Sequence, residues 1–179
     1  MNNIFFTSDH HFGHKLMLQY RPFADTYEMD DILIEKWNSV VGEKDTVYYL
    51  GDFSWRQWSE TVKILKKLNG KIIYIEGNHD KPIKQIMTRK ASHKIIEFHP
   101  SYHEFKFNNR HIILSHYCFK TWNRSHWGSY HLYGHSHGNL IDESGKKRHD
   151  VGVDNNNLLP VSIEEIDDIM KNKLTVKFD

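Results

Sequence analysis

The chain has 179 residues, a length that favours one domain with a core of its own. It is 39% hydrophobic and 26% charged, as ordinary globular proteins are. Its formal net charge of +1 argues against a partner held mainly by bulk charge, such as long nucleic acid or an anionic membrane. The single cysteine, Cys118, cannot form an internal disulfide, no apolar run is long enough to span a membrane, and the N-terminus has no signal-peptide pattern. We therefore expect a cytoplasmic protein.

The first half of the chain alternates strand and helix patterns. Short apolar runs predict three strands, over Ile4–Thr7, Thr46–Leu50 and Lys71–Glu76. Apolar residues at helical spacing predict helices from Asp30 to Val41 and from Trp58 to Leu68, and we expect a short helix after Pro82. This order is a βαβαβ unit, which is typical of a parallel sheet.

The second half is richer in strand patterns. It predicts strands over Ile95–Phe98, Tyr102–Phe107, His111–Ser115, Tyr130–Tyr133, Lys147–Val153 and Leu174–Phe178. Asn108-Asn109 is expected to form a hairpin turn, and Ser162 begins a helix with a capping box to Glu165. A mostly antiparallel part would thus follow the βαβαβ unit. Together they predict a single α/β domain over residues 1–179, with two mixed sheets and helices outside.

Five polar clusters follow apolar, strand-like runs for the most part. They are Asp9 with His11, Gly51-Asp52, Gly77-Asn78-His79-Asp80, His116, and Gly134-His135-Ser136-His137. Carboxylate and imidazole ligands suit Mn, Fe, Zn, Ni or Co, whereas Ca or Mg would favour an all-oxygen shell. Two metals about 3.5–4 Å apart need a bridging group, usually a carboxylate. Asp52 is the natural bridge because it is the lone acid on its loop.

The order Asp-x-His, Gly-Asp, Gly-Asn-His-Asp, His, Gly-His-x-His resembles the calcineurin-like metallophosphoesterases, and more narrowly their small stand-alone bacterial and phage members. The resemblance runs from Asp9 to His137. It implies a metallo-dependent phosphatase-like fold, a four-layer α/β/β/α sandwich, and two divalent transition-metal ions per chain, with Mn favoured. One departure is the segment Gly51–Arg56, where many relatives have a second acid that is missing here.

The resemblance also implies a role for each polar residue. Asp9, His11 and His137 would bind the first metal. Asn78, His116 and His135 would bind the second, and Asp52 would bridge both. A hydroxide formed on the metals would attack phosphorus, His79 would act as general acid toward the leaving alkoxide, and Asp80 would orient His79.

Residues outside this set are expected to contact the substrate. These are His14, Arg56 and Arg124, with Trp122 or Trp127 as a stacking surface for a base. For each of them a structural role stays open: His14 could cap a helix, and the 115–138 segment could be a loop pinned by aromatic packing. His10 is expected to be structural, because strand alternation points it away from its neighbours.

Three functions are compatible with these patterns. The first is a metal-dependent phosphoesterase for a small, nucleotide-like ester, with a diester favoured over a monoester. The second is a nuclease for single-stranded nucleic acid, which the near-neutral charge disfavours. The third is a non-catalytic metal-binding scaffold, which the intact ligand set and His79 disfavour.

Overall fold

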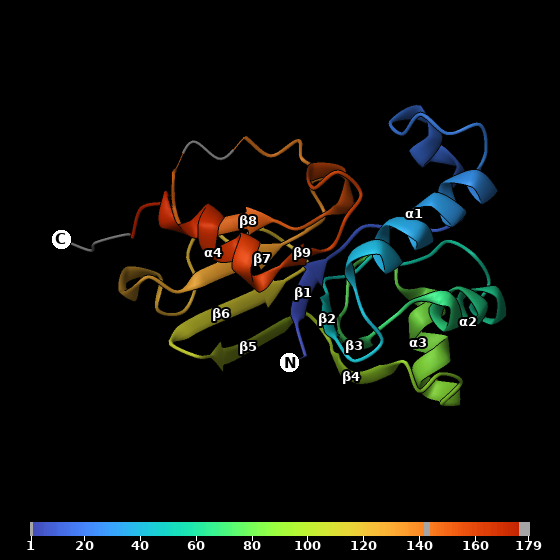
Figure 1. Ribbon diagram of the computed structural model, residues 1–179, viewed down its shortest axis with the longest axis horizontal. Coiled ribbons are helices and arrows are strands. Elements are labelled where there is room, and N and C mark those ends of the chain that lie inside the picture. The colour runs from blue at the N-terminus through green and yellow to red at the C-terminus, as the bar shows by residue number, and fades with distance from the viewer. Residues whose placement is uncertain (1, 142–143, 176–179) are drawn as a thin grey trace.

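Two sheets lie at the centre of the molecule, and the computed structural model describes residues 2–141 and 144–175 (Figure 1). The first sheet has five strands in the order β4-β3-β2-β1-β9. Its strands are β1 (Ile4–Thr7), β2 (Thr46–Tyr49), β3 (Lys71–Ile75), β4 (Ile95–His99) and β9 (Val161–Ser162). β1 to β4 are parallel, and β9 is antiparallel to β1. The predicted parallel βαβαβ unit is therefore confirmed.

The second sheet has four strands in the order β5-β6-β7-β8. They are β5 (Tyr102–Phe107), β6 (Arg110–Ser115), β7 (Tyr130–Tyr133) and β8 (Arg148–Asp150). Only β5 and β6 are antiparallel, since β6 with β7 and β7 with β8 are parallel. The prediction of a mostly antiparallel second half was wrong. Parallel neighbours need a long connection, and the connection 116–129 carries the chain back to the starting end of the sheet before β7 begins.

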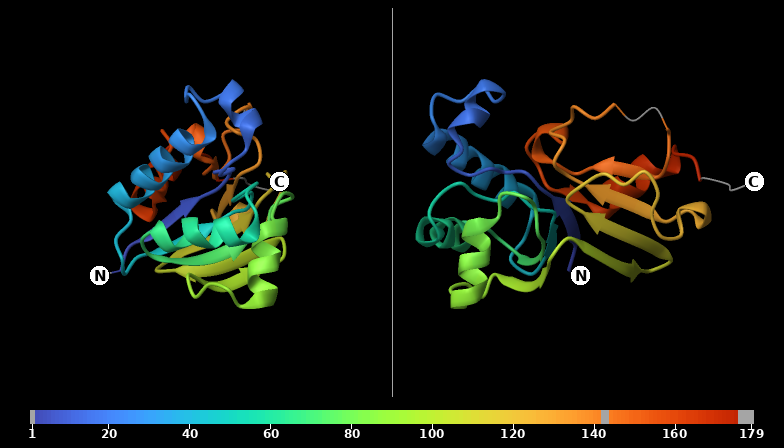
Figure 2. Two further views of the ribbon diagram at one scale, coloured as in Figure 1. Left: turned by 90° about the vertical axis from the view of Figure 1, so that its right-hand side faces the viewer. Right: turned by 180° about the vertical axis from the view of Figure 1, so that it is seen from behind.

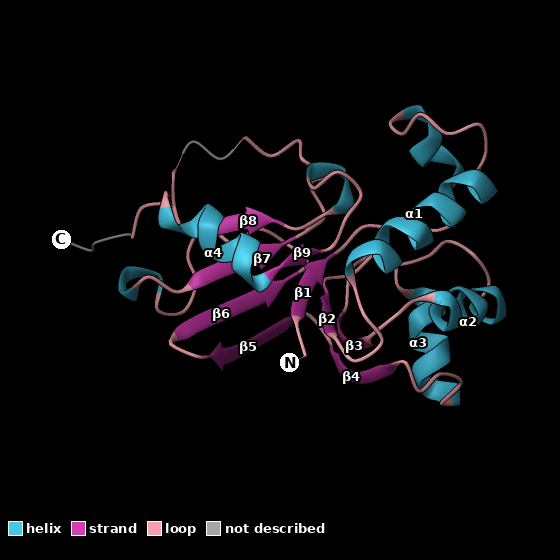
Figure 3. Ribbon diagram, viewed as in Figure 1, coloured by secondary structure: helices cyan, strands magenta, loops and turns pink. Residues whose placement is uncertain are grey.

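In the described part of the chain, four α-helices are present, and they cover the sheets (Figure 3). They are α1 (Thr26–Val40), α2 (Trp58–Lys67), α3 (Lys81–Arg89) and α4 (Ile163–Lys171). α1 begins at Thr26 rather than at Asp30, because the side chain of Asp25 accepts hydrogen bonds from two backbone N–H groups of the first turn. The predicted capping box of Ser162 and Glu165 is present at α4. Most of the predicted terminal strand lies outside the described residues.

Alternate side chains along β1, β2 and β3 point to opposite faces of the first sheet and belong to two different hydrophobic cores. Phe5 of β1 packs with the helices α1, α2 and α3, whereas Phe6 lies between the sheets. The inter-sheet core contains Leu114 of β6 and Leu132 of β7, and α4 adds Ile166 to it. Figure 2 shows the result: α1 to α3 lie at one end of the molecule and the second sheet with α4 at the other. The predicted α/β fold class with two mixed sheets is confirmed.

Within the described residues, no helix is long and apolar enough to cross a membrane.

Candidate metal centre

The loops that follow β1, β2, β3, β6 and β7 meet at one place between the two sheets. Backbone hydrogen bonds join them, from Asp9 N to Gly51 O at 3.0 Å and from Gly134 N to His116 O at 3.0 Å. The carboxylate of Asp9 also accepts from His135 N at 2.8 Å. The structure therefore brings the polar clusters of the sequence together, as their positions after strands predicted.

The backbone of this centre is strained. Five of the predicted ligands have left-handed φ angles between 48° and 69°: Asp9, His11, Asp52, His135 and His137. A residue other than glycine in this region costs roughly 1–3 kcal/mol, and such residues gather at functional sites. The surrounding hydrogen bonds hold these side chains in positions that an unstrained loop would not give them.

The first group of side chains is formed by Asp9, His11 and His137, whose ligand atoms lie within 4.8 Å of one another. Asp9 Oδ1 and His11 Nε2 are both buried and have no hydrogen-bond partner. They lie 3.9 Å apart. Buried polar atoms without a partner are rare in folded proteins, and two converging on one point are the pattern that a bound cation would satisfy.

The second group is formed by Asp52, His116 and His135, again within 4.8 Å. His116 Nδ1 lies 2.7 Å from the carbonyl oxygen of Leu50, so it carries the proton and leaves a lone pair on Nε2. That lone pair faces Asn78 Oδ1, another acceptor, at 2.9 Å. Two acceptors that face each other repel unless a cation lies near both, so this donor set also fits a metal ion.

Asp52 lies between the two groups. Its Oδ2 is 3.6 Å from His11 Nε2 of the first group and 3.6 Å from His116 Nε2 of the second. Its Oδ1 accepts a hydrogen bond from His79 N at 2.8 Å. One carboxylate thus reaches both groups and the residue predicted as general acid, which is the position that the proposed bridge requires.

Burial makes charge costly in the first group. It raises the pKa of Asp9 well above the usual range of a carboxyl group and lowers the pKa of His11 to about 2. A carboxylate in this place is therefore unstable by itself, and an imidazole stays neutral. A divalent cation would stabilise the charged carboxylate of Asp9 and bind the neutral imidazole of His11, because a metal ligand must be deprotonated.

The ion pair of Arg21 and Asp154 supports the first group and was missed from the sequence. Asp154 Oδ2 lies 2.6 Å from His137 Nδ1, and its carboxylate accepts from Arg21 Nε at 2.7 Å and Nη2 at 2.8 Å. Arg21 is buried and also donates to the backbone carbonyl of Asp9 at 2.8 Å. A carboxylate behind a histidine fixes the ring and leaves Nε2 free for a metal. No local pattern indicates this pair, since its members are 133 residues apart.

Asp80 has a different role from the one predicted. Its buried carboxylate accepts four hydrogen bonds, and none comes from the His79 ring. The donors are the backbone N–H groups of Asp52, Phe53 and Gly77 and the hydroxyl group of Tyr74. Asp80 therefore joins the loop after β2 to the loop after β3. Its hydrogen bonds position the backbone of Asp52, and no hydrogen bond to the His79 ring supports the expectation that Asp80 orients His79.

Aromatic side chains surround the exposed ring of His79. Trp55 lies 5.0 Å from it between ring centroids, and His14 stacks on Trp55 at 4.0 Å. Trp55 also donates from Nε1 to His11 Nδ1 at 3.1 Å. An imidazole that binds a metal through Nε2 carries its proton on Nδ1, so this hydrogen bond and metal binding at Nε2 exclude one another. His14 lies at the centre's edge, and its contact with substrate stays a prediction.

Tyr117 lies at the other side of the centre. Its hydroxyl group donates to Asn78 Oδ1 at 3.3 Å, and its ring is 4.7 Å from that of His135. The side chain is half exposed, so it borders the second group and faces solvent. Its place directly after His116 in the chain is the signal that could have identified it.

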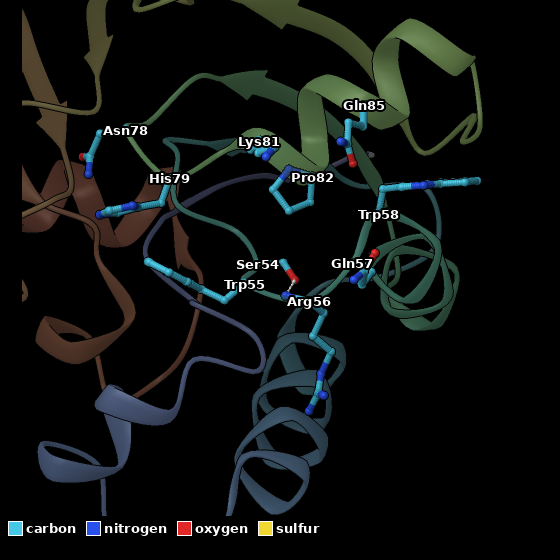
Figure 4. A pocket seen from close by; sticks show the side chains of 10 residues that line it. All are labelled: Ser54, Trp55, Arg56, Gln57, Trp58, Asn78, His79, Lys81, Pro82 and Gln85. Atoms are coloured by element: carbon cyan, nitrogen blue, oxygen red, sulfur yellow. Dashed lines mark hydrogen bonds between the residues drawn. The ribbon is translucent and has the colours of Figure 1, made fainter.

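The two predicted substrate arginines do not reach the centre. Arg56 Nε pairs with Asp30 Oδ2 of α1 at 2.6 Å, and Figure 4 shows its side chain running toward α1, away from His79. Arg124 lies near the start of β7, with its guanidinium 5.4 Å from the Trp127 ring. The long connection has returned to the opposite end of the sheet at that point. Both arginines therefore make structural contacts, and their contact with a substrate stays a prediction.

Trp122 and His10 lie in the interior of the protein and have structural contacts. Trp122 is buried and its ring lies 5.3 Å from that of His131, which supports the packing alternative for the 115–138 segment. His10 is fully buried, and its Nδ1 lies 2.9 Å from the hydroxyl group of Tyr49. The structural role predicted for His10 is confirmed.

Comparison with known proteins places the chain in a family. The calcineurin-like phosphoesterase superfamily domain matches residues 3–151. An uncharacterised protein of Methanocaldococcus jannaschii is 36% identical over 175 residues, which cover 93% of this chain and 90% of that protein. The gene 66 protein of Mycobacterium phage L5 is 41% identical over 100 residues, about half of each chain (54% and 47%).

A solved structure agrees with the fold. The crystal structure of a protein of unknown function from Aquifex aeolicus has a TM-score of 0.74 and 24% identity, covering 94% of this chain and all of that one. The family carries divalent metal ions, and the two groups of histidine and aspartate side chains described above are able to bind them. The chain belongs to the calcineurin-like phosphoesterase superfamily.

Proposed function

We propose that the protein is a phosphodiesterase that depends on two divalent metal ions, manganese first among them, and hydrolyses small nucleotide-like esters. The observation that carries the proposal is the place of Asp52, whose Oδ2 is 3.6 Å from a histidine of each group. A centre with one shared carboxylate and separate terminal ligands is the arrangement of two-metal hydrolytic sites. The family supports hydrolysis of a phosphate ester, and the diester preference is our proposal.

When bound, two such ions supply a nucleophile from water at neutral pH and neutralise the oxygens of the phosphate. The first ion would be held by Asp9, His11 and His137, and Asp52 would be shared. The second would be held by Asn78, His116 and His135. The chain's own contribution is to fix these ligands, through Asp154 on one side and the carbonyl oxygen of Leu50 on the other.

His79 is the proposed proton donor. Its backbone is held by Asp52 Oδ1 at 2.8 Å, and its ring is exposed, 6.0 Å from the ring of His11. A phosphate bound at both groups would lie beside this side chain. It can donate a proton to the leaving alcohol oxygen, an effect worth roughly 10²–10⁴-fold in rate.

The test is hydrolysis by protein reconstituted with manganese. Bis-p-nitrophenyl phosphate and p-nitrophenyl phosphate would be compared at equal concentration, with metal content measured on the same sample. We expect faster hydrolysis of the diester, and loss of activity in Asp52→Asn. No hydrolysis of either ester by protein that contains two metal ions would refute the proposal and favour a scaffold. Degradation of single-stranded nucleic acid at low enzyme concentration would favour a nuclease.

A further inference from the structure

A pocket of about 470 Å³ opens beside His79 (Figure 4). The loop after β2 forms one wall and the start of α3 forms the other. In Figure 4 the labelled side chains surround an open centre, with His79 and Trp55 at one end and Trp58 at the other. The pocket is lined by Ser54, Trp55, Arg56, Gln57, Trp58, Asn78, His79, Lys81, Pro82 and Gln85. Its volume falls within the ordinary range for a site that holds a small organic molecule.

The position of His79 decides which part of a substrate would enter this pocket. A general acid must lie within hydrogen-bond distance of the leaving oxygen. The leaving alcohol therefore lies on the His79 side of the phosphate, and the rest of that alcohol extends past His79. The pocket is the space that the structure offers there, since His79 and Asn78 are part of its wall.

The lining indicates the chemistry of the alcohol. It contains no carboxylate, and it combines two tryptophans with the amide side chains of Gln57 and Gln85. Amides both donate and accept hydrogen bonds, and indole rings stack on planar groups. The exposed side chain of Lys81 adds a charged hydrogen-bond donor. The charge of Arg56 is already paired with Asp30.

We propose that this pocket is the subsite for the leaving alcohol and that the alcohol is a nucleoside. A planar heterocycle whose edge carries donors and acceptors, attached to an alcohol that can bear a phosphate, fits the tryptophans, the two glutamines and Lys81 together. The inference rests on the proposed function, because it takes the role of His79 from it. Trp55 belongs both to the pocket and to the surroundings of His11, so it connects the subsite to the metal centre.

The test uses adenosine, which has no phosphate group with which to bind the metals. Adenosine should inhibit hydrolysis of bis-p-nitrophenyl phosphate competitively, while ribose should not inhibit. Adenosine and inorganic phosphate should inhibit together without excluding each other, because they occupy neighbouring places. Mutual exclusion, or no inhibition by adenosine, would overturn the proposal.

Variants locate the binding site. Gln85→Ala and Lys81→Gln should each weaken adenosine binding about fivefold, the effect of one lost hydrogen bond. Lys84→Gln is the matched control, since Lys84 lies on the same helix but pairs with Glu76 outside the pocket. Equal adenosine affinity in all four proteins would refute the assignment. Calorimetric titration of the metal-loaded protein with adenosine measures this affinity even if no ester is hydrolysed, so failure of the pocket and failure of the proposed function are distinguishable.

Discussion

Replacing Asp154 with asparagine tests whether the buried pair with Arg21 supports the metal centre. The substitution keeps the shape of the side chain and one acceptor, but it removes the negative charge. The charged carboxylate lies 2.6 Å from His137 Nδ1 and accepts hydrogen bonds from two nitrogens of Arg21 at 2.7 and 2.8 Å. Hydrogen bonds from Arg21 and His137 outweigh the effect of burial and hold the pKa of Asp154 well below its usual value, so the carboxylate is charged at neutral pH.

Two magnitudes follow from the structure. The side chains of Arg21 and Asp154 are 2% and 15% exposed, so the variant leaves a buried guanidinium without its partner. Breaking a buried pair costs about 3–5 kcal/mol, and the acceptor that asparagine keeps places this case at the lower end, about 3 kcal/mol. For a chain of this size, that corresponds to a fall of roughly 6–12 °C in Tm. Loss of the group behind a metal-binding histidine weakens metal binding by roughly 10–100-fold.

Urea unfolding of the metal-free protein and calorimetric titration with manganese measure the two effects separately. Asp168→Asn is the control, because Asp168 forms an exposed pair with Lys171 on the surface of α4. Such pairs contribute less than about 1 kcal/mol. If Asp154→Asn unfolds like the control and binds manganese with unchanged affinity, the pair does not support the centre and our reasoning about it is refuted.

Three further predictions concern single side chains. His79→Asn should keep both metals and lose roughly 10²–10⁴-fold in kcat, with the largest loss on esters that have poor leaving groups. Asp80→Asn should slow the hydrolysis of esters with good and poor leaving groups alike. If the two variants show the same dependence on the leaving group, the division of roles between His79 and Asp80 is contradicted. Adding zinc should change the tryptophan fluorescence of the wild-type protein and not that of Trp55→Phe, because metal binding by His11 displaces the indole N–H of Trp55 from His11 Nδ1. An unchanged wild-type spectrum would refute this prediction. Burial lowers the pKa of His131 to about 4, below its value in the unfolded chain, so the unfolded state binds the proton first and stability falls as the pH drops. Between pH 7 and 5 the wild type should lose about 2 kcal/mol relative to His131→Phe in urea titrations, and parallel pH profiles would count against this buried role.

The sequence was informative wherever a local pattern determines the structure. The strands that end at Asp9, Asp52 and Asn78 could be predicted because apolar runs stop at polar residues, and parallel strands gather their ends at one edge. The helix after Ser162 could be predicted from its capping box. Each of these patterns depends only on residues that are close together in the sequence.

Contacts between distant segments could not be predicted. Asp154 lies in a polar stretch without periodicity, and nothing near it indicates that Arg21 pairs with it. The parallel pairing of β6 with β7 was missed because pairing direction depends on the path of the connection, which no local pattern records. The same connection carries Arg124 away from the centre. The role predicted for Asp80 was inferred from His79, its neighbour in the chain, whereas two of the hydrogen bonds that its carboxylate accepts come from the distant loop after β2.

The central claim is that Asp52 is shared by two metal ions. The most direct measurement is anomalous diffraction from crystals of the protein grown with manganese. We predict two peaks about 3.5–4 Å apart, both within bonding distance of the Asp52 carboxylate, one beside Asp9, His11 and His137 and the other beside His116 and His135. A single peak, or two peaks of which only one contacts Asp52, would contradict the claim.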